Sequence, residues 1–305
     1  MNRMLRSIVA PAAVLLVSGI APARRSVSSD APDAAYVQSF EKWKAEQTDD
    51  LKANWLSLVG LFWLKPGVNT FGSDPGNAIV FPKGPAHAGE FDLEGNEVTL
   101  RMKSDTHATI AGETVTTAKM DPDTSAHVTR VEMGTLRFHV IIRGQHVGIR
   151  VRDTDSAASR NFKGMMFYPL DPNYRVTAAW TPSIGKTVEI PNVLGEVTQE
   201  TSPGIVTFRL NGADLSLTAL GGDAKSGLFF VFSDPTAKSD TYPGGRFLES
   251  EAVKDGKVIL DFNRAHNPPC AVTPYATCPL APKENRLTIA IPAGEKFDKA
   301  AHGHH

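Results

Sequence analysis

Short runs in which apolar and polar residues alternate dominate the chain from Leu56 onward. The alternation is clearest in residues 135–142 and 146–152, which Arg143-Gly144-Gln145 separates. A side-chain period of two is typical of a β-strand that buries one face. Because short turns that contain Gly, Asn or Asp join antiparallel neighbours, the pattern predicts a series of β-hairpins.

Two turn signals near the C-terminal end make this prediction specific. Asn211-Gly212 and Asp255-Gly256 both favour the tight turn of a two-residue hairpin. We expect residues 246–253 and 257–263 to pair across the second of these turns. Residues 286–291 are then expected to form a closing strand.

One segment near the N-terminus has a helical pattern instead. Within residues 35–51, Tyr36, Phe40, Trp43 and Leu51 recur near a period of 3.6 residues, and charged residues occupy other positions. We expect the apolar stripe of this helix to pack on the sheet, and binding of a partner protein is the alternative.

The number of predicted strands decides the fold class. About fifteen strands at short spacing cannot remain in one flat sheet. We therefore predict a mainly β protein, an antiparallel β-barrel or a two-sheet sandwich built from hairpins, with one N-terminal helix packed on it. Residues 35–297 are expected to form a single domain, and a division into two lobes near residues 160–174 is left open.

The first 23 residues have the features of an export signal. Arg3 and Arg6 precede an apolar stretch from Ile8 to Ile20, and Ala21-Pro22-Ala23 fits a small-residue cleavage site. The apolar stretch is short for a bilayer span, although an uncleaved anchor is the alternative. We expect a periplasmic or extracellular protein, with residues 24–34 as a disordered linker and 298–305 as a disordered tail.

Charge and motifs exclude several function classes. The chain has 32 Lys and Arg against 33 Asp and Glu, and no basic patch favours nucleic acid. After removal of the signal, no segment has the apolar length of a membrane span. The sequence has no nucleophile elbow, phosphate-binding loop, zinc-protease motif or dinucleotide fingerprint. We therefore expect no cofactor and no metal, and the oligomeric state is open.

The two cysteines lie in a proline-rich loop. In an exported protein, Cys270 and Cys278 are expected to form a disulfide or a pair of buried thiols. Zinc needs about four ligands, and only His266 is near them in sequence. A redox-active or nucleophilic thiol is the remaining alternative.

Polar residues gather in the same part of the chain, between Asp240 and Glu295. Arginine presents a planar fork of donors that suits carboxylates, and Asn offers both a donor and an acceptor. The structural alternative is that these groups satisfy one another and the backbone of proline loops. The candidate ligand-binding residues are Arg150, Arg152, Arg246, Asn263, Arg264, Asn267 and Tyr275.

Several motifs resemble those of one known family, the bacterial and archaeal proteins grouped as domain of unknown function 1684. The motifs are GRFL, LDFNRAHNPPC, PYATCPL, ENRL and AGEK, with WLSLVGLFWL and RVRD upstream. The resemblance extends from about Ala35 to Lys296 and implies no established activity. The family motif usually has Tyr at the position of His266.

Three functional expectations follow. The first is an exported small-molecule-binding module, in which Arg150, Arg152 and Arg246 grip an anionic or hydroxyl-rich ligand in the mouth of a β-barrel. The second is an envelope hydrolase, with Asp261 as general base or nucleophile and Tyr242 or Arg246 stabilising charge. The third is a structural or interaction protein of the envelope. Whether the protein is an enzyme is open at this point.

Overall fold

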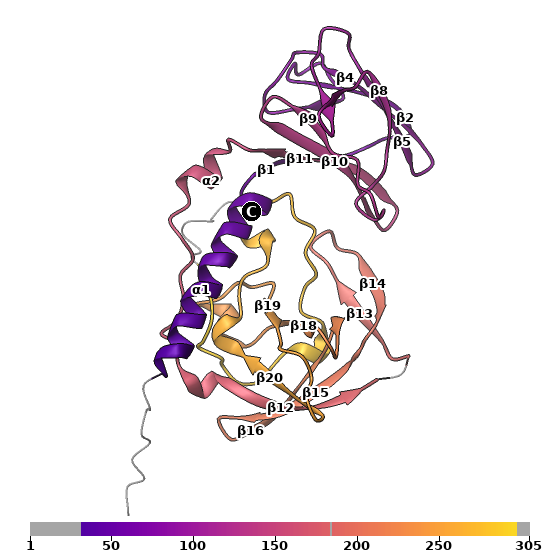
Figure 1. The fold of residues 1–305 in the computed structure, drawn as a ribbon. Helices are drawn as coiled ribbons and strands as arrows, with labels where there is room; N and C mark the ends of the chain where they lie inside the picture. The colour runs from indigo at the N-terminus through magenta and orange to yellow at the C-terminus, as the bar shows by residue number, and fades with distance from the viewer. Residues whose placement is uncertain (1–31, 184, 298–305) are drawn as a thin grey trace, which may run out of the picture. The chain divides into compact units, whose positions relative to one another are not determined.

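The computed structural model describes residues 32–183 and 185–297. The predicted signal sequence, most of the predicted linker and the predicted tail lie outside the described residues. The described part is mainly β with one long helix near its N-terminal end, as predicted (Figure 1). None of its helices is both long enough and apolar enough to span a bilayer.

The helix predicted from the 3.6-residue pattern is confirmed. Helix α1 (Ala34–Asp50) begins after Asp33, whose carboxylate accepts the backbone N–H of Ala35, and continues as a π-helical turn, Leu51–Trp55. Phe40 is buried, and its ring lies 5.8 Å from Trp43 and 5.6 Å from Phe167, centroid to centroid. The apolar stripe of α1 therefore packs against the rest of the chain.

Residues 58–153 form two sheets that share one hydrophobic core. Phe71 and Phe91 of the smaller sheet meet Phe138 of the larger one at centroid distances of 5.8 Å each. The six-stranded sheet has the order β1-β11-β10-β9-β6-β7, from β1 (Leu58–Trp63), β6 (Thr109–Ile110), β7 (Glu113–Thr114), β9 (Val131–Met133), β10 (Leu136–Arg143) and β11 (His146–Asp153). The five-stranded sheet has the order β3-β2-β4-β5-β8, from β2 (Gly67–Gly72), β3 (Ile79–Val80), β4 (Gly89–Glu94), β5 (Glu97–Met102) and β8 (Thr117–Met120).

The C-terminal part of the chain forms three further sheets around a second core cluster, in which Phe262 contacts Phe208 and Phe232. The four-stranded sheet, β16-β15-β12-β20, contains β12 (Arg175–Pro182), β15 (Gly204–Leu210), β16 (Ala213–Thr218) and β20 (Lys257–Asp261). The smaller sheets are formed by β13 (Thr187–Pro191) with β14 (Val197–Thr201), and by β17 (Gly221–Asp223), β18 (Gly227–Phe232) and β19 (Arg246–Glu249). The short helical elements are α2 (Ala157–Asn161) and the 3-10 turns Pro172–Tyr174, Pro235–Lys238, Phe262–Arg264, Pro269–Ala271 and Lys283–Asn285.

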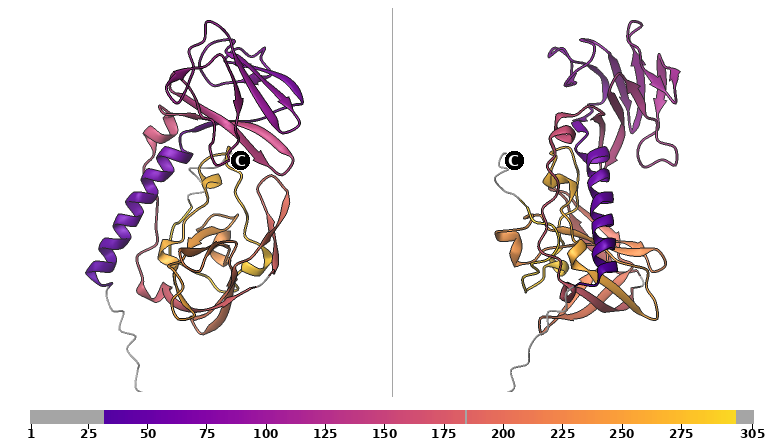
Figure 2. Two further views of the ribbon diagram at one scale, coloured as in Figure 1. Left: turned by 45° about the vertical axis from the view of Figure 1, so that its right-hand side comes forward. Right: turned by 60° about the vertical axis from the view of Figure 1, so that its left-hand side comes forward.

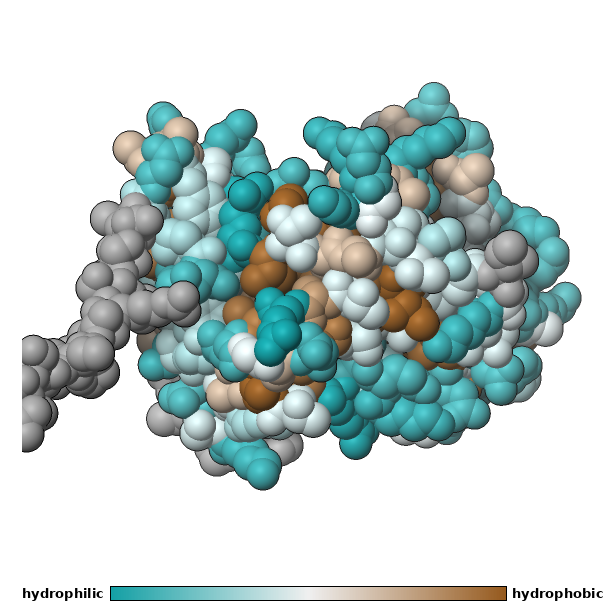
Figure 3. Space-filling view, turned by 90° about the horizontal axis from the view of Figure 1, so that it is seen from below, coloured by the Kyte–Doolittle hydropathy of each residue, from teal (hydrophilic) through white to brown (hydrophobic). Residues whose placement is uncertain are grey.

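The antiparallel prediction is confirmed for almost every strand pair. Among the named strands of the described residues, only β2 and β3 pair in parallel. The sheets of the described ranges are open, so the closed barrel is not found. The face seen from below Figure 1 is mixed, with apolar residues in several areas that hydrophilic residues separate (Figure 3).

Two details of strand pairing differ from the sequence-based prediction. Asp255 and Gly256 do make a tight turn with positive φ angles of 51° and 68°, but the strands on either side choose different partners. Strand β19 pairs with β18, and β20 pairs with β12, because each buries its apolar side chains in that neighbour. Residues 286–291 form no strand, since the backbone N–H of Ile291 donates to a carboxylate instead of to a β-ladder.

Candidate functional site

A C-terminal segment, residues 261–272, follows α1 along its length. Tyr36 meets Asp261 near the start of the helix, Ser39 accepts a hydrogen bond from Arg264, and Trp43 lies 6.0 Å from His266, centroid to centroid. The views of Figure 2 also have α1 beside the C-terminal part of the chain. The predicted helix and the proline-rich motif are thus in contact, through residues that are more than 200 positions apart in sequence.

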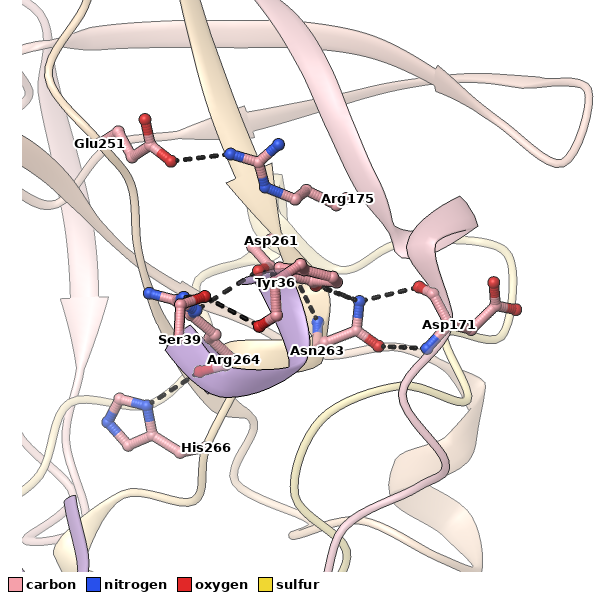
Figure 4. Close-up of polar contacts among 9 residues, drawn as sticks. All are labelled: Tyr36, Ser39, Asp171, Arg175, Glu251, Asp261, Asn263, Arg264 and His266. Atoms are coloured by element: carbon pink, nitrogen blue, oxygen red, sulfur yellow. Dashed lines mark hydrogen bonds and ion pairs between the residues drawn. The ribbon is translucent and has the colours of Figure 1, made fainter. Parts of the chain in front are cut away.

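The first of these contacts is a compact network around Asp261 (Figure 4). The Tyr36 hydroxyl lies 2.8 and 2.9 Å from the two carboxylate oxygens of Asp261. Asn263 donates to Asp261 through its backbone N–H at 3.2 Å, and its side-chain amide both donates to and accepts from the backbone of Asp171. Arg264 Nε lies 3.4 Å from Asp261, with the carboxylate about one tenth exposed.

This network holds α1 on the C-terminal segment. Burial, followed by the charge of Asp261, raises the pKa of Tyr36, so its hydroxyl remains a donor. Asp261 is thus held by protein donors, and its side chain is only about one tenth exposed. The exposed pair of Arg175 and Glu251 in Figure 4 adds little, because solvent screens it.

Arg246 lies in a different network. Its Nη2 is 2.7 Å from Asp234 and 3.0 Å from the carbonyl oxygen of Ile291, and its Nη1 donates to the carbonyl of Ala293. The side chains of Arg246 and Asp234 are each 1% exposed. This buried pair fixes residues 291–293, so the guanidinium of Arg246 does not face a ligand.

Tyr242 lies beside the two cysteines. The backbone N–H of Cys270 is 3.2 Å from Cys278 Sγ, and both residues are free thiols in this structure. A hydrogen bond with Cys278 lowers the pKa of Cys270, whereas the same bond and burial raise the pKa of Cys278. The two thiols lie within hydrogen-bond reach of each other, and the disulfide stays a prediction.

A cleft of about 270 Å³ opens where α1 ends. The last turn of α1 and the π-helical turn, including Trp55, form one wall, and His266 to Val272 form another. Phe247 and Glu249 of β19 and the buried carboxyl of Glu295 complete it. The network around Asp261 therefore positions the segment that lines this cleft.

Glu295 and Asn267 are the unusual groups of the cleft. Burial raises the pKa of Glu295 to about 7, even though its carboxylate accepts the backbone N–H of Asn267 at 2.7 Å. The side-chain amide of Asn267 donates to the carbonyl of Lys296 at 3.0 Å. Its Oδ1 is buried and has no hydrogen-bond partner among the described residues. An acceptor in this state is costly unless a donor reaches it.

His266 stands at the side of the cleft. Its Nδ1 is 3.3 Å from the carbonyl of Arg264 and 3.8 Å from Glu249, and its ring lies 6.0 Å from that of Phe247. Asp50 adds a further carboxylate to the lining. The cleft is therefore rich in acceptors and has aromatic side chains on two walls. Within the described ranges, no three His, Cys, Asp or Glu side chains gather as metal ligands would.

The remaining predicted residues lie elsewhere. Arg150 and Arg152 are on β11, where the Arg150 guanidinium is 6.0 Å from the Trp55 ring and Arg152 Nε donates to the carbonyl of Asn54 at 3.3 Å. Tyr275 is half-buried in the loop between the cysteines, and its backbone N–H donates to Thr273.

The polar residues that lie between Asp240 and Glu295 in the sequence do not gather in one place in the structure. Asp261, Asn263 and Arg264 lie together, whereas Arg246 and Tyr242 each have other partners. Of the predicted ligand-binding residues, Asn267 is the one in the cleft lining. Sequence reasoning missed Trp55, Glu249 and Glu295; two of them lie in quoted motifs, WLSLVGLFWL and AGEK, but no local pattern joins these to one another.

A comparison with family models agrees with the C-terminal motifs. A family model described as a protein of unknown function (DUF1684) matches residues 160–296. An uncharacterised protein of Haloarcula marismortui, solved by NMR, is 31% identical over 46% of this chain and 79% of its own, with a TM-score of 0.38. One chain of a crystal structure of the FhaA FHA domain complexed with the intracellular domain of Rv3910 is 14% identical over 30% of this chain and 97% of its own, with a TM-score of 0.21. No curated protein matched.

The matched range of the family model contains most of the cleft. It runs through β12, β19 and β20 to the residue after Glu295, and so includes His266 and Asn267. On this match and the motifs that it contains, the chain belongs to the DUF1684 family of proteins of unknown function.

Proposed function

We propose that the protein is an exported small-molecule-binding protein, and that the cleft at the end of α1 holds a hydroxyl-rich ligand. One observation carries this proposal: the buried Oδ1 of Asn267 has no donor among the described residues, at the edge of a cleft. A ligand hydroxyl that donates to this oxygen would satisfy an acceptor that the chain leaves unpaired.

The lining of the cleft supports a ligand with many donors. Asp50, Glu249 and Glu295 supply carboxyl groups, and each can accept from a hydroxyl. Trp55 and Phe247 supply apolar walls for the C–H face of a ring. An anionic ligand would face these carboxylates, so the anionic alternative has no support in this cleft. The volume of about 270 Å³ is near the lower end of small-molecule sites, which suits a ligand of one sugar ring or a polyol.

The proposed ligand lies in an open cleft, not in a barrel mouth. For residues 58–153, we propose the sandwich alternative of the predicted fold. The shared core supports it, because Phe71 and Phe91 of one sheet pack against Phe138 of the other.

Hydrolysis of envelope glycosides is a second candidate, favoured by the state of Glu295. Because burial raises its pKa to about 7, this carboxyl can hold a proton at neutral pH and act as a general acid. Glu295 is a better candidate than Asp261 for this role, since Glu295 lines the cleft and Asp261 is not among the lining residues. Glu295→Gln should abolish hydrolysis of a chromogenic glycoside and retain binding; absence of turnover in the wild type leaves the binding function alone.

A thermal-shift screen tests the binding function. The purified protein is screened against monosaccharides, polyols and organic acids, and a hit is titrated by calorimetry. Asn267→Ala and Trp55→Ala should each weaken binding by about tenfold, because each removes about 1–2 kcal/mol of contact. The matched control is Asn161→Ala, at an exposed position of α2. The binding proposal fails if no ligand shifts the melting temperature, which would favour the structural or interaction role, or if both cleft variants bind like the wild type.

Export is tested separately. Residues 1–23 support it through their charge, apolar stretch and cleavage site. Cell fractionation followed by mass spectrometry should find a mature chain that begins at Arg24 outside the cytoplasm. A cytoplasmic chain that retains Met1 would contradict the proposal.

A further inference from the structure

One face of the β10–β11 hairpin is basic. In the β10–β11 pair, Arg137 lies opposite Arg152 and His139 lies opposite Arg150. Residues that are directly opposed in this way project from the same face of the sheet. The opposite face carries Phe138 and Val140, which belong to the hydrophobic core. Arg143 and His146 are opposed in the same way, so four arginines and two histidines gather on the side of the sheet that faces away from that core.

Arg150 is the residue of this face whose donors are not satisfied. It is 5% exposed, and its Nε and Nη2 are buried without a hydrogen-bond partner among the described residues. These two nitrogens form one edge of the guanidinium, and their N–H bonds point in parallel. This is the edge that binds two oxygens of a carboxylate or phosphate at once. The Trp55 ring, 6.0 Å away, offers its π face but no acceptor for these N–H groups.

The other charged groups of this face have partners of their own. Arg143 pairs with Asp123 at 2.8 Å and donates to Thr277 at 3.0 Å. Arg137 pairs with Glu132 at 3.0 Å, and Arg152 donates to the carbonyl of Asn54. The carboxylate of Asp123, which lies near enough to act on Arg150, is therefore already bound to another guanidinium.

The nearby titratable groups do not neutralise Arg150. Burial and the charges of Arg152 and Arg150 lower the pKa of His139 to about 4, so this imidazole is neutral at pH 7. Burial and the charges of Arg143 and Arg152 lower the pKa of Arg150 to about 10, which still leaves it protonated. Cys278, the remaining titratable neighbour, has a raised pKa and is neutral. A buried, charged donor pair without an acceptor is costly, and a bound anion would remove that cost.

We propose that Arg150 is an anion site, where its Nε and Nη2 bind two oxygens of a carboxylate or phosphoryl group. Arg143 and Arg152 add positive charge around this group. The site is distinct from the hydroxyl-binding cleft, although both use Trp55: the cleft is lined by carboxylates, and this face by guanidinium groups. The proposal does not rest on the identity of the cleft ligand.

The test uses simple anions on the purified protein. Sodium acetate, phosphate and chloride are compared at equal ionic strength by differential scanning fluorimetry and calorimetric titration. We expect acetate or phosphate to raise the melting temperature by several degrees over chloride, because binding to the folded state stabilises it. A larger shift in acetate indicates that the site takes a carboxylate, and a larger shift in phosphate indicates that it takes a phosphoryl group.

Two variants and a control locate the effect. Arg150→Met should melt at or above the wild type in chloride and lose the acetate or phosphate shift, since the uncompensated charge is gone. Arg150→Lys should weaken the anion affinity by about tenfold, because a point charge cannot replace the fork. Arg209→Met, at an arginine side chain that is 70% exposed, should keep the full shift.

Three outcomes would overturn the proposal. The first is a wild type that acetate and phosphate stabilise no more than chloride does. The second is an anion shift that survives intact in Arg150→Met. The third is full anion affinity in Arg150→Lys, which would exclude two-oxygen binding by the guanidinium edge.

Discussion

Removal of the Asp234 carboxylate should nearly unfold the C-terminal part of the protein. Asp234→Ala leaves Arg246 charged and about 1% exposed, without its ion-pair partner. Breaking a buried pair in this way costs about 3–5 kcal/mol. The carboxylate also accepts the backbone N–H of Thr236 at 2.9 Å and of Ile291 at 3.0 Å, which adds about 1 kcal/mol each at most.

The sum, about 3–7 kcal/mol, is comparable with the whole stability of an ordinary domain, about 5–15 kcal/mol. Urea unfolding followed by circular dichroism and by tryptophan fluorescence measures the loss and checks whether the transition is two-state. The control is Glu251→Ala, which breaks the exposed pair with Arg175 and should cost less than about 1 kcal/mol. A double variant, Asp234→Leu with Arg246→Met, should lose less than Asp234→Ala, because it leaves no buried charge. Equal losses in Asp234→Ala and Glu251→Ala would refute this reasoning.

Three further predictions follow from the site. The raised pKa of Glu295 means that the folded state holds this proton more tightly than the unfolded state does. The free energy of unfolding should therefore fall by about 3 kcal/mol as pH rises from 4.5 to about 7. Glu295→Gln should lack this fall, and a variant whose stability depends on pH as the wild type's does would contradict the prediction. Tyr36→Phe should cost about 1–3 kcal/mol, because Asp261 loses its hydroxyl donor, whereas the control Tyr275→Phe should cost less. Thiol titration of the exported protein should find no free thiol before reduction and two after it; after reduction, Cys270 should be alkylated before Cys278, whose pKa is raised.

Local patterns were sufficient to predict several elements of this fold. The helical period of Tyr36, Phe40 and Trp43 predicted α1, and alternation predicted the β10–β11 hairpin. The turn at Asn211-Gly212 is confirmed by positive φ angles of 50° and 82° between β15 and β16. These features depend on residues close in sequence, so a single chain displays them.

Partner choice could not be predicted in the same way. Strands β19 and β20 flank a genuine turn and still pair with β18 and β12, because burial of their side chains outweighs the local hairpin. The residues of the site depend on contacts of still longer range. Tyr36 and Asp261 are 225 positions apart, and the cleft joins Trp55 to Glu295. The types of the polar residues indicated which groups could bind a ligand. Only the packing of the chain decides that Arg246 is buried with Asp234 while Asn267 lines a cleft.

The central claim is that Asn267 Oδ1 accepts a hydrogen bond from a ligand hydroxyl in this cleft. The most direct measurement is a double-mutant cycle by calorimetry, which combines wild type and Asn267→Ala with a hydroxylated ligand and the analogue that lacks one hydroxyl. We predict a coupling free energy of about 1 kcal/mol or more for one hydroxyl of the ligand, because the two groups then bind each other. The claim would be contradicted if, for every hydroxyl tested, the binding free energy lost by Asn267→Ala and that lost by removing the hydroxyl were additive.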